Sequence, residues 1–368
     1  MHIPDGYLSP STCAVGYAVA VPAWVVASRR VTKVVKTRYV PMLAVFAALS
    51  FLVMMFNVPI PDGTTAHAVG GGIIAICLGP WAAVIAVSVA LLFQALLFGD
   101  GGVLSYGVNV VNMAVILPFV AYAVYRLVSG RVPLTGRRRV VAAGIGGYVG
   151  INAAALAAAV EFGIQPDLFT TSTGAPLYSP YHLSQTIPAM LLPHLTVAGL
   201  CEAVLSAGVL AYLQRADIGR LVPNHPGIPM TGDGSSPKPG RLSPAKVALG
   251  VMGLMVLLTP LGLLAPGGAF GEDTPANLDL GSLGLSTVPA GLERYNGLWS
   301  HALLGGYGFR SGDHTDLAYI LSAVVGILVV GAVVFGVVFG VGKVVRVVGR
   351  RGGAPATADA ERSTVTHG

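Results

Sequence analysis

Two histidines lie in settings that could bind a transition metal. His2 directly follows Met1, so the free amine of Met1, the amide nitrogen of His2 and its Nδ1 could hold one ion in fused chelate rings. One further nitrogen would complete a planar set of four, which nickel(II) and copper(II) favour. The arrangement requires a retained and unblocked Met1, and we expect no cleaved signal peptide because no basic segment precedes the first apolar run. The alternative is a histidine that stands at position two by accident.

The second histidine, His67, precedes a run of glycines in the string AHAVGGG. Glycines 70–72 lack side chains, which lets another segment approach the main chain closely. Residues 60–63 repeat the string IPDG of residues 3–6, which predicts a similar turn ahead of each histidine. The alternative is that His67 is a hydrogen-bonded structural residue at a helix end.

Other polar residues within apolar runs could support such a site. Asn109 and Asn112 share one helix face at i and i+3, so they could hydrogen-bond the metal ligands or join two helices. His194 and Glu202 share a face eight residues apart and could line an ion path or pair with each other. We therefore treat Asn109, Asn112 and His194 as candidates for the layer around the ligands.

Membrane helices must position these residues, because the composition does not suit a soluble domain. Hydrophobic residues make up 54% of the chain and charged residues only 10%, whereas soluble domains carry about 25% charged residues. The 49 glycines suit helices that pack closely in a bilayer. The three cysteines lie far apart in apolar runs, which argues against a disulfide framework or a CxxC metal site.

The apolar runs predict an all-α integral membrane protein with nine spans. A helix needs about 20 mostly apolar residues to cross the hydrocarbon core. The stretch from 66 to 98 is divided at Gly79 and Pro80, because proline starts a new helix well. The expected spans are 11–28, 39–56, 66–79, 80–98, 103–128, 139–162, 186–213, 246–266 and 317–342.

The distribution of Lys and Arg predicts the orientation. These residues cluster after spans one, five, seven and nine, and the connections on the other side carry Asp and Glu with almost no Lys or Arg. The positive clusters should be cytoplasmic, so the N-terminus is expected outside. The net charge of +6 then reflects topology and suits anionic lipid, and we do not expect nucleic-acid binding.

Changes in composition divide the chain into four regions. A Pro-, Gly- and Ser-rich stretch predicts a cytoplasmic linker at 216–244. It separates a seven-helix metal-binding domain at 1–215 from a two-span accessory domain at 245–345. The small polar residues of 346–368 predict a disordered tail.

The string MHIPDGYLSP, followed by AHAVGGG, resembles the CbiM/NikM-type substrate-binding components of energy-coupling-factor cobalt and nickel transporters, over roughly residues 1–215. The resemblance implies that Met1, His2 and His67 bind Ni²⁺ or Co²⁺ as the transported substrate. It also implies two kinds of partner, a transmembrane coupling protein and cytoplasmic ATPase subunits, in the bacterial cell membrane. Residues 245–345 are similar to the small NikN/PDGLE-like accessory component, although PAGLE at 289–293 departs from the usual PDGLE.

Two other function classes compete with this interpretation. An enzyme is not expected, because Ser and His follow no recognised catalytic pattern, and neither a P-loop nor an organic cofactor is expected. A self-sufficient secondary carrier would need several carboxylates within spans, each costing about 2.5 to 3.5 kcal/mol at mid-membrane on insertion scales. Glu161 and Glu202 are the candidates near spans. Such a carrier, or another polytopic protein that works without ATPases, stays open as the alternative.

Overall fold

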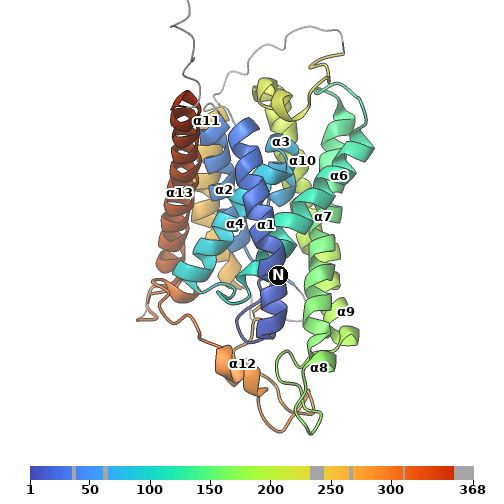
Figure 1. Ribbon diagram of the computed structural model, residues 1–368, viewed down its shortest axis with the longest axis vertical. Helices are drawn as coiled ribbons and strands as arrows, with labels where there is room; N and C mark the ends of the chain where they lie inside the picture. Colours follow the sequence, from blue (N-terminus) through green and yellow to red (C-terminus); the bar gives the residue numbers. More distant parts are fainter. Residues whose placement is uncertain (35–38, 61–64, 233–243, 265–267, 310, 352–368) are drawn as a thin grey trace, which may run out of the picture.

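The computed structural model describes residues 1–34, 39–60, 65–232, 244–264, 268–309 and 311–351. This part of the chain is a bundle of long helices, with loops and the short helix α12 gathered at its lower end in Figure 1. One small antiparallel hairpin, with Val58 opposite Ala66, interrupts the helical pattern. The all-α membrane fold expected from composition is therefore confirmed.

The helices follow the chain order of the predicted spans, and several long helices contain a π-helical turn. The elements are α1 (Pro10–Val34), α2 (Val40–Met55), β1 (Val58–Pro59), β2 (Thr65–Ala66), α3 (Gly71–Leu78), α4 (Pro80–Phe93), η2 (Gln94–Phe98), α5 (Tyr106–Asn109), η3 (Val110–Ile116), α6 (Leu117–Ser129), α7 (Arg137–Gly163), α8 (Gln165–Leu168), α9 (Leu183–Pro193), η4 (His194–Ala198), α10 (Gly199–Ala216), η5 (Ile218–Arg220), η6 (Val222–Asn224), α11 (Pro244–Leu258), η7 (Thr259–Leu264), η8 (Pro275–Asn277), α12 (Ala290–Tyr295), η9 (Gly305–Tyr307) and α13 (Thr315–Arg351).

The predicted span 66–79 is wrong as a full membrane helix. Its helical part, α3, has only eight residues, which corresponds to about 12 Å of helix. Gly70 adopts a left-handed conformation with φ of 76°, so the chain before it cannot continue the helix. The predicted break between two segments is confirmed, because Gly79 has φ of 93° and α4 starts at Pro80. The other expected spans correspond to helices, of which α2 is short at 16 residues.

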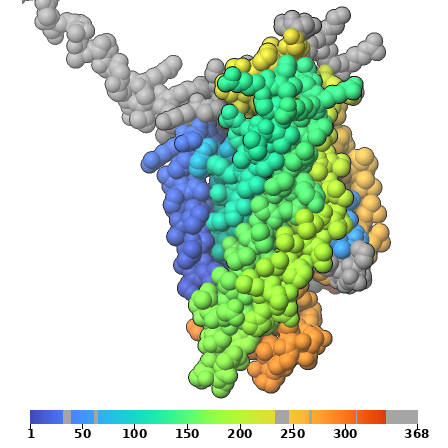
Figure 2. Space-filling model, turned by 90° about the vertical axis from the view of Figure 1, so that its right-hand side faces the viewer, coloured from blue at the N-terminus to red at the C-terminus, as the bar shows by residue number. Residues whose placement is uncertain are grey.

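The accessory helices pack on one side of the bundle, along α2. In α13, Gly326 lies against Phe51 of α2, where a Cβ would meet the aromatic ring at 2.0 Å. Tyr319 of the same helix donates a hydrogen bond to the Met55 carbonyl (3.0 Å). The segment 268–309 lies between α11 and α13 in the chain and at the lower end of the molecule, beside the lower end of the green helices in Figure 2.

The first part of the predicted linker packs against the bundle. The Asn224 side chain donates to the carbonyls of Ala75 and Ile76 (3.1 and 2.8 Å), so it satisfies the C-terminal end of α3. His225 is buried and its Nε2 lies 3.1 Å from the hydroxyl of Tyr125. Residues 233–243 of the predicted linker lie outside the described part. Within the predicted tail, residues 346–351 continue α13, and residues 352–368 lie outside the described part of the chain.

Candidate metal centre

The N-terminal segment folds back into the bundle and brings His2 against His67. Their rings are stacked with centroids 5.0 Å apart and an interplanar angle of 28°. Met1, His2 and His67 are all buried, although His67 lies 65 residues further along the chain. Figure 1 places the N-terminus within the outline of the bundle, above the lower end of α1. The structure therefore assembles the three residues that the sequence singled out.

The hydrogen bonds of the two imidazoles leave nitrogen atoms unused. His67 Nδ1 lies 3.0 Å from the carbonyl of Ala68, which accepts a hydrogen bond and so assigns the proton to Nδ1. His67 Nε2 then carries a lone pair and has no partner among the described residues, and His2 Nε2 is likewise buried without one. A buried unpaired nitrogen is unusual in a native structure and requires an explanation. A lone pair of this kind is what a transition metal needs.

Burial also keeps His2 in its metal-binding form. Removal from water, with a smaller effect of the neighbouring positive amine, lowers the pKa of His2 to about 3. The imidazole is therefore neutral at physiological pH, and only the neutral ring offers a lone pair to a metal.

Glu202 of α10 fixes the loop that carries His67. Its carboxylate accepts hydrogen bonds from the main-chain N–H groups of Val69 (2.8 Å), Gly70 (2.8 Å) and Gly72 (3.2 Å). These groups form the N-terminal end of α3, where the helix dipole favours a negative charge. Glu202 is fully buried, so the end of the His67 loop that it binds has little freedom to move.

The expected pairing of His194 with Glu202 does not form. His194 Nδ1 lies 2.6 Å from the Met190 carbonyl in the preceding turn, whereas Glu202 is occupied by the α3 main chain. Helical spacing correctly placed both residues within one continuous helical segment, α9 to α10, but it carried no information about the distant loop whose main chain bonds Glu202. The supporting role expected for His194 stays a prediction.

Asn109 and Asn112 bond to different partners. Asn109 holds the residue after His2, since its Oδ1 accepts from Ile3 N (2.9 Å) and its Nδ2 donates to Ile3 O (3.1 Å). Asn109 therefore contacts the residue next to His2 rather than a candidate ligand, and the supporting role expected for it stays a prediction. Asn112 instead donates to Glu161 at 2.6 Å, which joins η3 to α7.

Asp5 anchors the N-terminal segment to the connection ahead of α5. Its carboxylate accepts hydrogen bonds from the main-chain N–H groups of Val103 (3.0 Å), Leu104 (2.8 Å) and Ser105 (3.1 Å), at the start of α5. The turn expected from the IPDG string thus places Asp5 where it ties residues 3–6 to the connection ahead of α5. Of the repeated string at 60–63, residues 61–63 lie outside the described part.

Three groups close to the N-terminus were not singled out by the sequence. Asp100 Oδ1 lies 3.2 Å from His2 Nδ1, and Tyr307 donates a hydrogen bond to the other oxygen of Asp100. Glu272 Oε1 lies 3.8 Å from the Met1 amine. Glu272 and Tyr307 belong to the segment between α11 and α13. In the sequence, Glu272 and Tyr307 stand out only as an acidic and an aromatic residue within loops. Each lies more than 250 residues from Met1, so no local pattern connects them to it.

A metal site at this position depends on main-chain nitrogen. Among the residues that the structure describes, no three His, Cys, Asp or Glu side chains are grouped so as to hold a metal ion. The two imidazoles alone would make an incomplete set of ligands. The amine of Met1 and the amide of His2 lie beside them and are the nearest source of further nitrogen donors.

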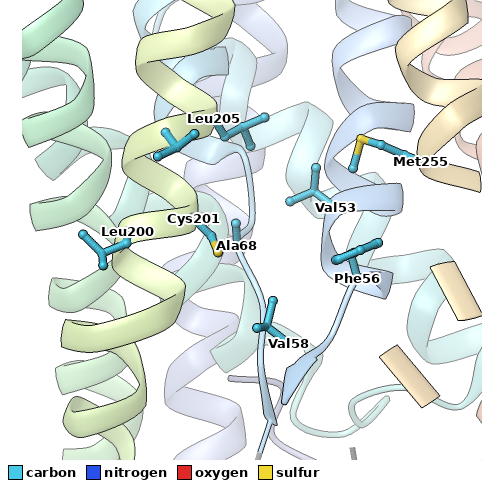
Figure 3. A pocket seen from close by; sticks show the side chains of 9 residues that line it. Val53, Phe56, Val58, Ala68, Leu200, Cys201, Leu205 and Met255 are labelled. Atoms are coloured by element: carbon cyan, nitrogen blue, oxygen red, sulfur yellow. The ribbon is translucent and has the colours of Figure 1, made fainter. Parts of the chain in front are cut away.

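An apolar cavity of about 400 Å³ lies next to the His67 loop but lacks such donors. Figure 3 shows its walls, formed by α2, β1 and α10, with Ala68 from the His67 loop and Met255 from α11. Its lining residues are Val53, Phe56, Val58, Ala68, Leu200, Cys201, Val204, Leu205 and Met255. This mostly hydrocarbon lining suits apolar groups rather than a hydrated cation, so the candidate metal centre is the buried cluster at the N-terminus.

Comparisons with known proteins place more than half of the chain in one family. Residues 2–218 match the model of a family described as the cobalt uptake substrate-specific transmembrane region. Over 350 residues, the chain is 45% identical to the fused nickel transport protein NikMN of Rhodobacter capsulatus, covering 90% of this chain and 95% of that protein. It is 44% identical to the "Probable fused nickel transport protein LarMN" of Lactiplantibacillus plantarum over 334 residues, covering 89% and 95% of the two chains.

A solved structure shares the fold of the N-terminal part. The crystal structure of a truncated transition metal transporter is 56% identical, with a TM-score of 0.54, and the similarity covers 58% of this chain and 98% of that one. The similarity to the fused nickel transport proteins extends over both the seven-helix part and the accessory part.

Proposed function

The chain belongs to the family of cobalt uptake substrate-specific transmembrane proteins, and we propose that it is the metal-binding membrane component of an importer for divalent nickel or cobalt. It is a multi-pass membrane protein and a transport component rather than an enzyme. The observation that carries the proposal is the stacking of buried His2 on buried His67 beside Met1. Residues 1–215 form the metal-binding domain in this proposal, and 245–345 form the accessory domain.

The proposed ligands are four nitrogens from three residues. Met1 contributes its amine, His2 contributes its amide nitrogen and Nδ1, and His67 contributes Nε2. The unused lone pair of His67 Nε2 and the neutral state of His2 support this assignment. The proposal requires a free Met1 amine in the mature protein, which N-terminal sequencing checks.

Nickel is the favoured substrate and cobalt is second. A planar set of nitrogens that includes an amide suits nickel(II). The two similar proteins that cover about nine tenths of this chain carry names that specify nickel, whereas a relative that matches 58% of it is named a cobalt transport protein. Affinity order alone would favour copper, so exclusion of copper must come from geometry and supply.

The importer needs partners that provide energy. We assign this role to a transmembrane coupling protein and cytoplasmic ATPase subunits, in the bacterial cell membrane, with the N-terminus outside. Glu202 disfavours a self-sufficient proton-coupled carrier, because its carboxylate is engaged by three main-chain N–H groups. Radioactive nickel uptake with and without co-expressed ATPase subunits separates these possibilities. Reporter fusions near residues 135 and 230 should both report a cytoplasmic location.

Metal binding by the purified full-length chain tests the proposal directly. We expect about one Ni²⁺ per chain, and the substitution His67→Ala should abolish tight binding. His301→Ala is the matched control, because His301 is exposed in the accessory segment and its ring contacts Ser300 and Trp299 rather than the N-terminus. Equal nickel affinity in the wild type and His67→Ala would refute the proposed site.

A further inference from the structure

Asp100 is a carboxylate in direct contact with the His2 imidazole. Its Oδ1 lies 3.2 Å from His2 Nδ1, and both side chains are largely shielded from solvent. The other oxygen, Oδ2, accepts from the Tyr307 hydroxyl and from Gln94 Nε2 (3.4 Å). The carboxylate is therefore held between His2 on one side and a Tyr and Gln pair on the other.

The structure holds Tyr307 firmly in this position. Its ring stacks on Phe98 with centroids 4.9 Å apart, and its carbonyl accepts a hydrogen bond from Ser322 of α13 (3.0 Å). Its hydroxyl also accepts from Gln94 Nε2 at 3.2 Å. Tyr307 has φ of 61°, a left-handed conformation that is costly for an aromatic residue and persists only where surrounding contacts impose it.

The chelate proposed for the metal requires His2 Nδ1, which faces Asp100 in this structure. A half-turn of the ring about Cβ–Cγ exchanges its two edges. It directs Nδ1 away from Asp100 and brings Nε2 to the edge that faces the carboxylate. Nε2, which has no partner among the described residues, then takes the position now held by Cε1 and can donate to Asp100 after a small shift of the carboxylate, while Nδ1 binds the metal.

We infer that Asp100 is the carboxylate that orients the metal-bound imidazole of His2, and that Tyr307 of the accessory segment positions Asp100 for this role. The inference rests on the proposed function, since it takes His2 as a ligand. A carboxylate hydrogen-bonded to a ligating histidine fixes the ring and makes it a better donor. Its negative charge also favours a nearby cation. The accessory segment thereby contributes to metal affinity without supplying a ligand.

The main rival is that Asp100 stabilises only the metal-free ring through its present contact with Nδ1. The two alternatives predict opposite signs. A carboxylate that supports the bound metal lowers affinity when it is replaced, whereas one that competes with the metal raises affinity when it is replaced.

The test measures Ni²⁺ affinity of the full-length chain by competition with a chelator of known affinity, in four variants. Asp100→Asn should weaken binding by about 10- to 100-fold, the usual effect of losing such a partner. Tyr307→Phe should weaken it by about threefold to tenfold, because it removes one neutral hydrogen bond to the carboxylate. Tyr319→Phe is the matched control, since its hydroxyl bonds the Met55 carbonyl instead, and should bind normally.

The double variant Asp100→Asn/Tyr307→Phe distinguishes positioning from general destabilisation. If Tyr307 acts through Asp100, the double variant should bind as Asp100→Asn does, whereas independent structural losses would add. Unchanged or tighter binding in Asp100→Asn or Tyr307→Phe overturns the inference, as does an additive double variant. The variant His67→Ala, measured in the same experiment, tests the proposed function separately from this inference. Normal binding by His67→Ala contradicts the proposed function itself, whereas lost binding there with unchanged Tyr307→Phe contradicts only this inference.

Discussion

The seven-helix part and the accessory part of the chain differ in how they pack and in which groups they bring to the candidate metal centre. The seven-helix part buries its polar site on its own helices, with Glu202, Asn109 and Asp5 each bonded to main-chain groups. In the accessory part, α11, η7 and α13 expose many apolar side chains, including Leu257, Leu264 and Leu328. The accessory part contacts the candidate metal centre through Glu272, which lies near the Met1 amine, and Tyr307, which donates to Asp100. The difference indicates that the proposed ligands and the side chains that hold them belong to the first part, whereas the second part contacts the candidate site from the end where its loops gather.

The comparison is tested most strongly at Met1. Inserting one alanine between Met1 and His2 keeps every side chain but enlarges the chelate ring and displaces the amine. Nickel affinity should fall by more than about 100-fold, because loss of groups that only support ligands already costs 10- to 100-fold. Isothermal titration of the purified protein measures this loss.

An alanine inserted after Gly174 serves as the control for that insertion. Gly174 lies in an exposed loop and a Cβ there would meet no atom within 4 Å, so binding should be unchanged. Normal affinity in the N-terminal insertion would show that the amine is not a ligand. The ligands would then have to be sought outside the first two residues.

Glu202→Gln should produce the next largest effect. An amide has one acceptor oxygen and would turn an NH₂ group toward main-chain N–H donors, so the loop of His67 should loosen. We expect nickel affinity to fall about tenfold and unfolding free energy to fall by about 2 kcal/mol, the scale of a hydrogen bond to a charged group. Binding and thermal unfolding in detergent measure both changes.

Glu161→Gln is the matched control, since Glu161 is a glutamate that accepts from Asn112 on a different pair of elements. Its nickel affinity should stay normal even if its stability falls. Equal losses of affinity in Glu161→Gln and Glu202→Gln would indicate general loosening of the bundle rather than a specific support for His67.

Truncation after residue 232 should have a smaller effect on binding. The seven-helix part retains all proposed ligands and most of the buried core, so the truncated protein should bind nickel. Affinity should fall by about tenfold at most, because the proposed ligands are retained while contacts of the accessory segment near the site, including those of Glu272 and Tyr307, are lost. Transport should be lost, as we expect the accessory spans to be required for it. Absence of binding in a folded truncated protein would contradict the division of roles.

Glu272→Gln should give the smallest change. The carboxylate lies 3.8 Å from the Met1 amine and is partly exposed, and such ion pairs contribute about 0 to 1 kcal/mol. Nickel affinity should therefore change by less than about fivefold. Glu293→Gln, an exposed glutamate of α12, is the control. A tenfold or larger change confined to Glu272→Gln would mean that the accessory part contributes more to the site than the comparison allows.

Composition and local pattern were sufficient to predict the membrane class, the helical fold and the break at Gly79 and Pro80. These properties depend on the length of apolar runs and on residues with restricted or permissive backbone, both of which are visible along the chain. The same reasoning selected His2 and His67 from eight histidines, and their contact agrees with that choice. Their role as ligands stays a prediction.

The tertiary structure decided what a linear pattern could not show. Span length alone misjudged 66–79, because Glu202 stabilises a short helix whose preceding loop stays extended inside the bundle. Asp100 and Tyr307 meet across 207 positions of sequence. Hydrophobic periodicity reports which face of a helix is buried but not which distant segment packs against it. Buried hydrogen bonds between such segments therefore become apparent only once the chain is folded.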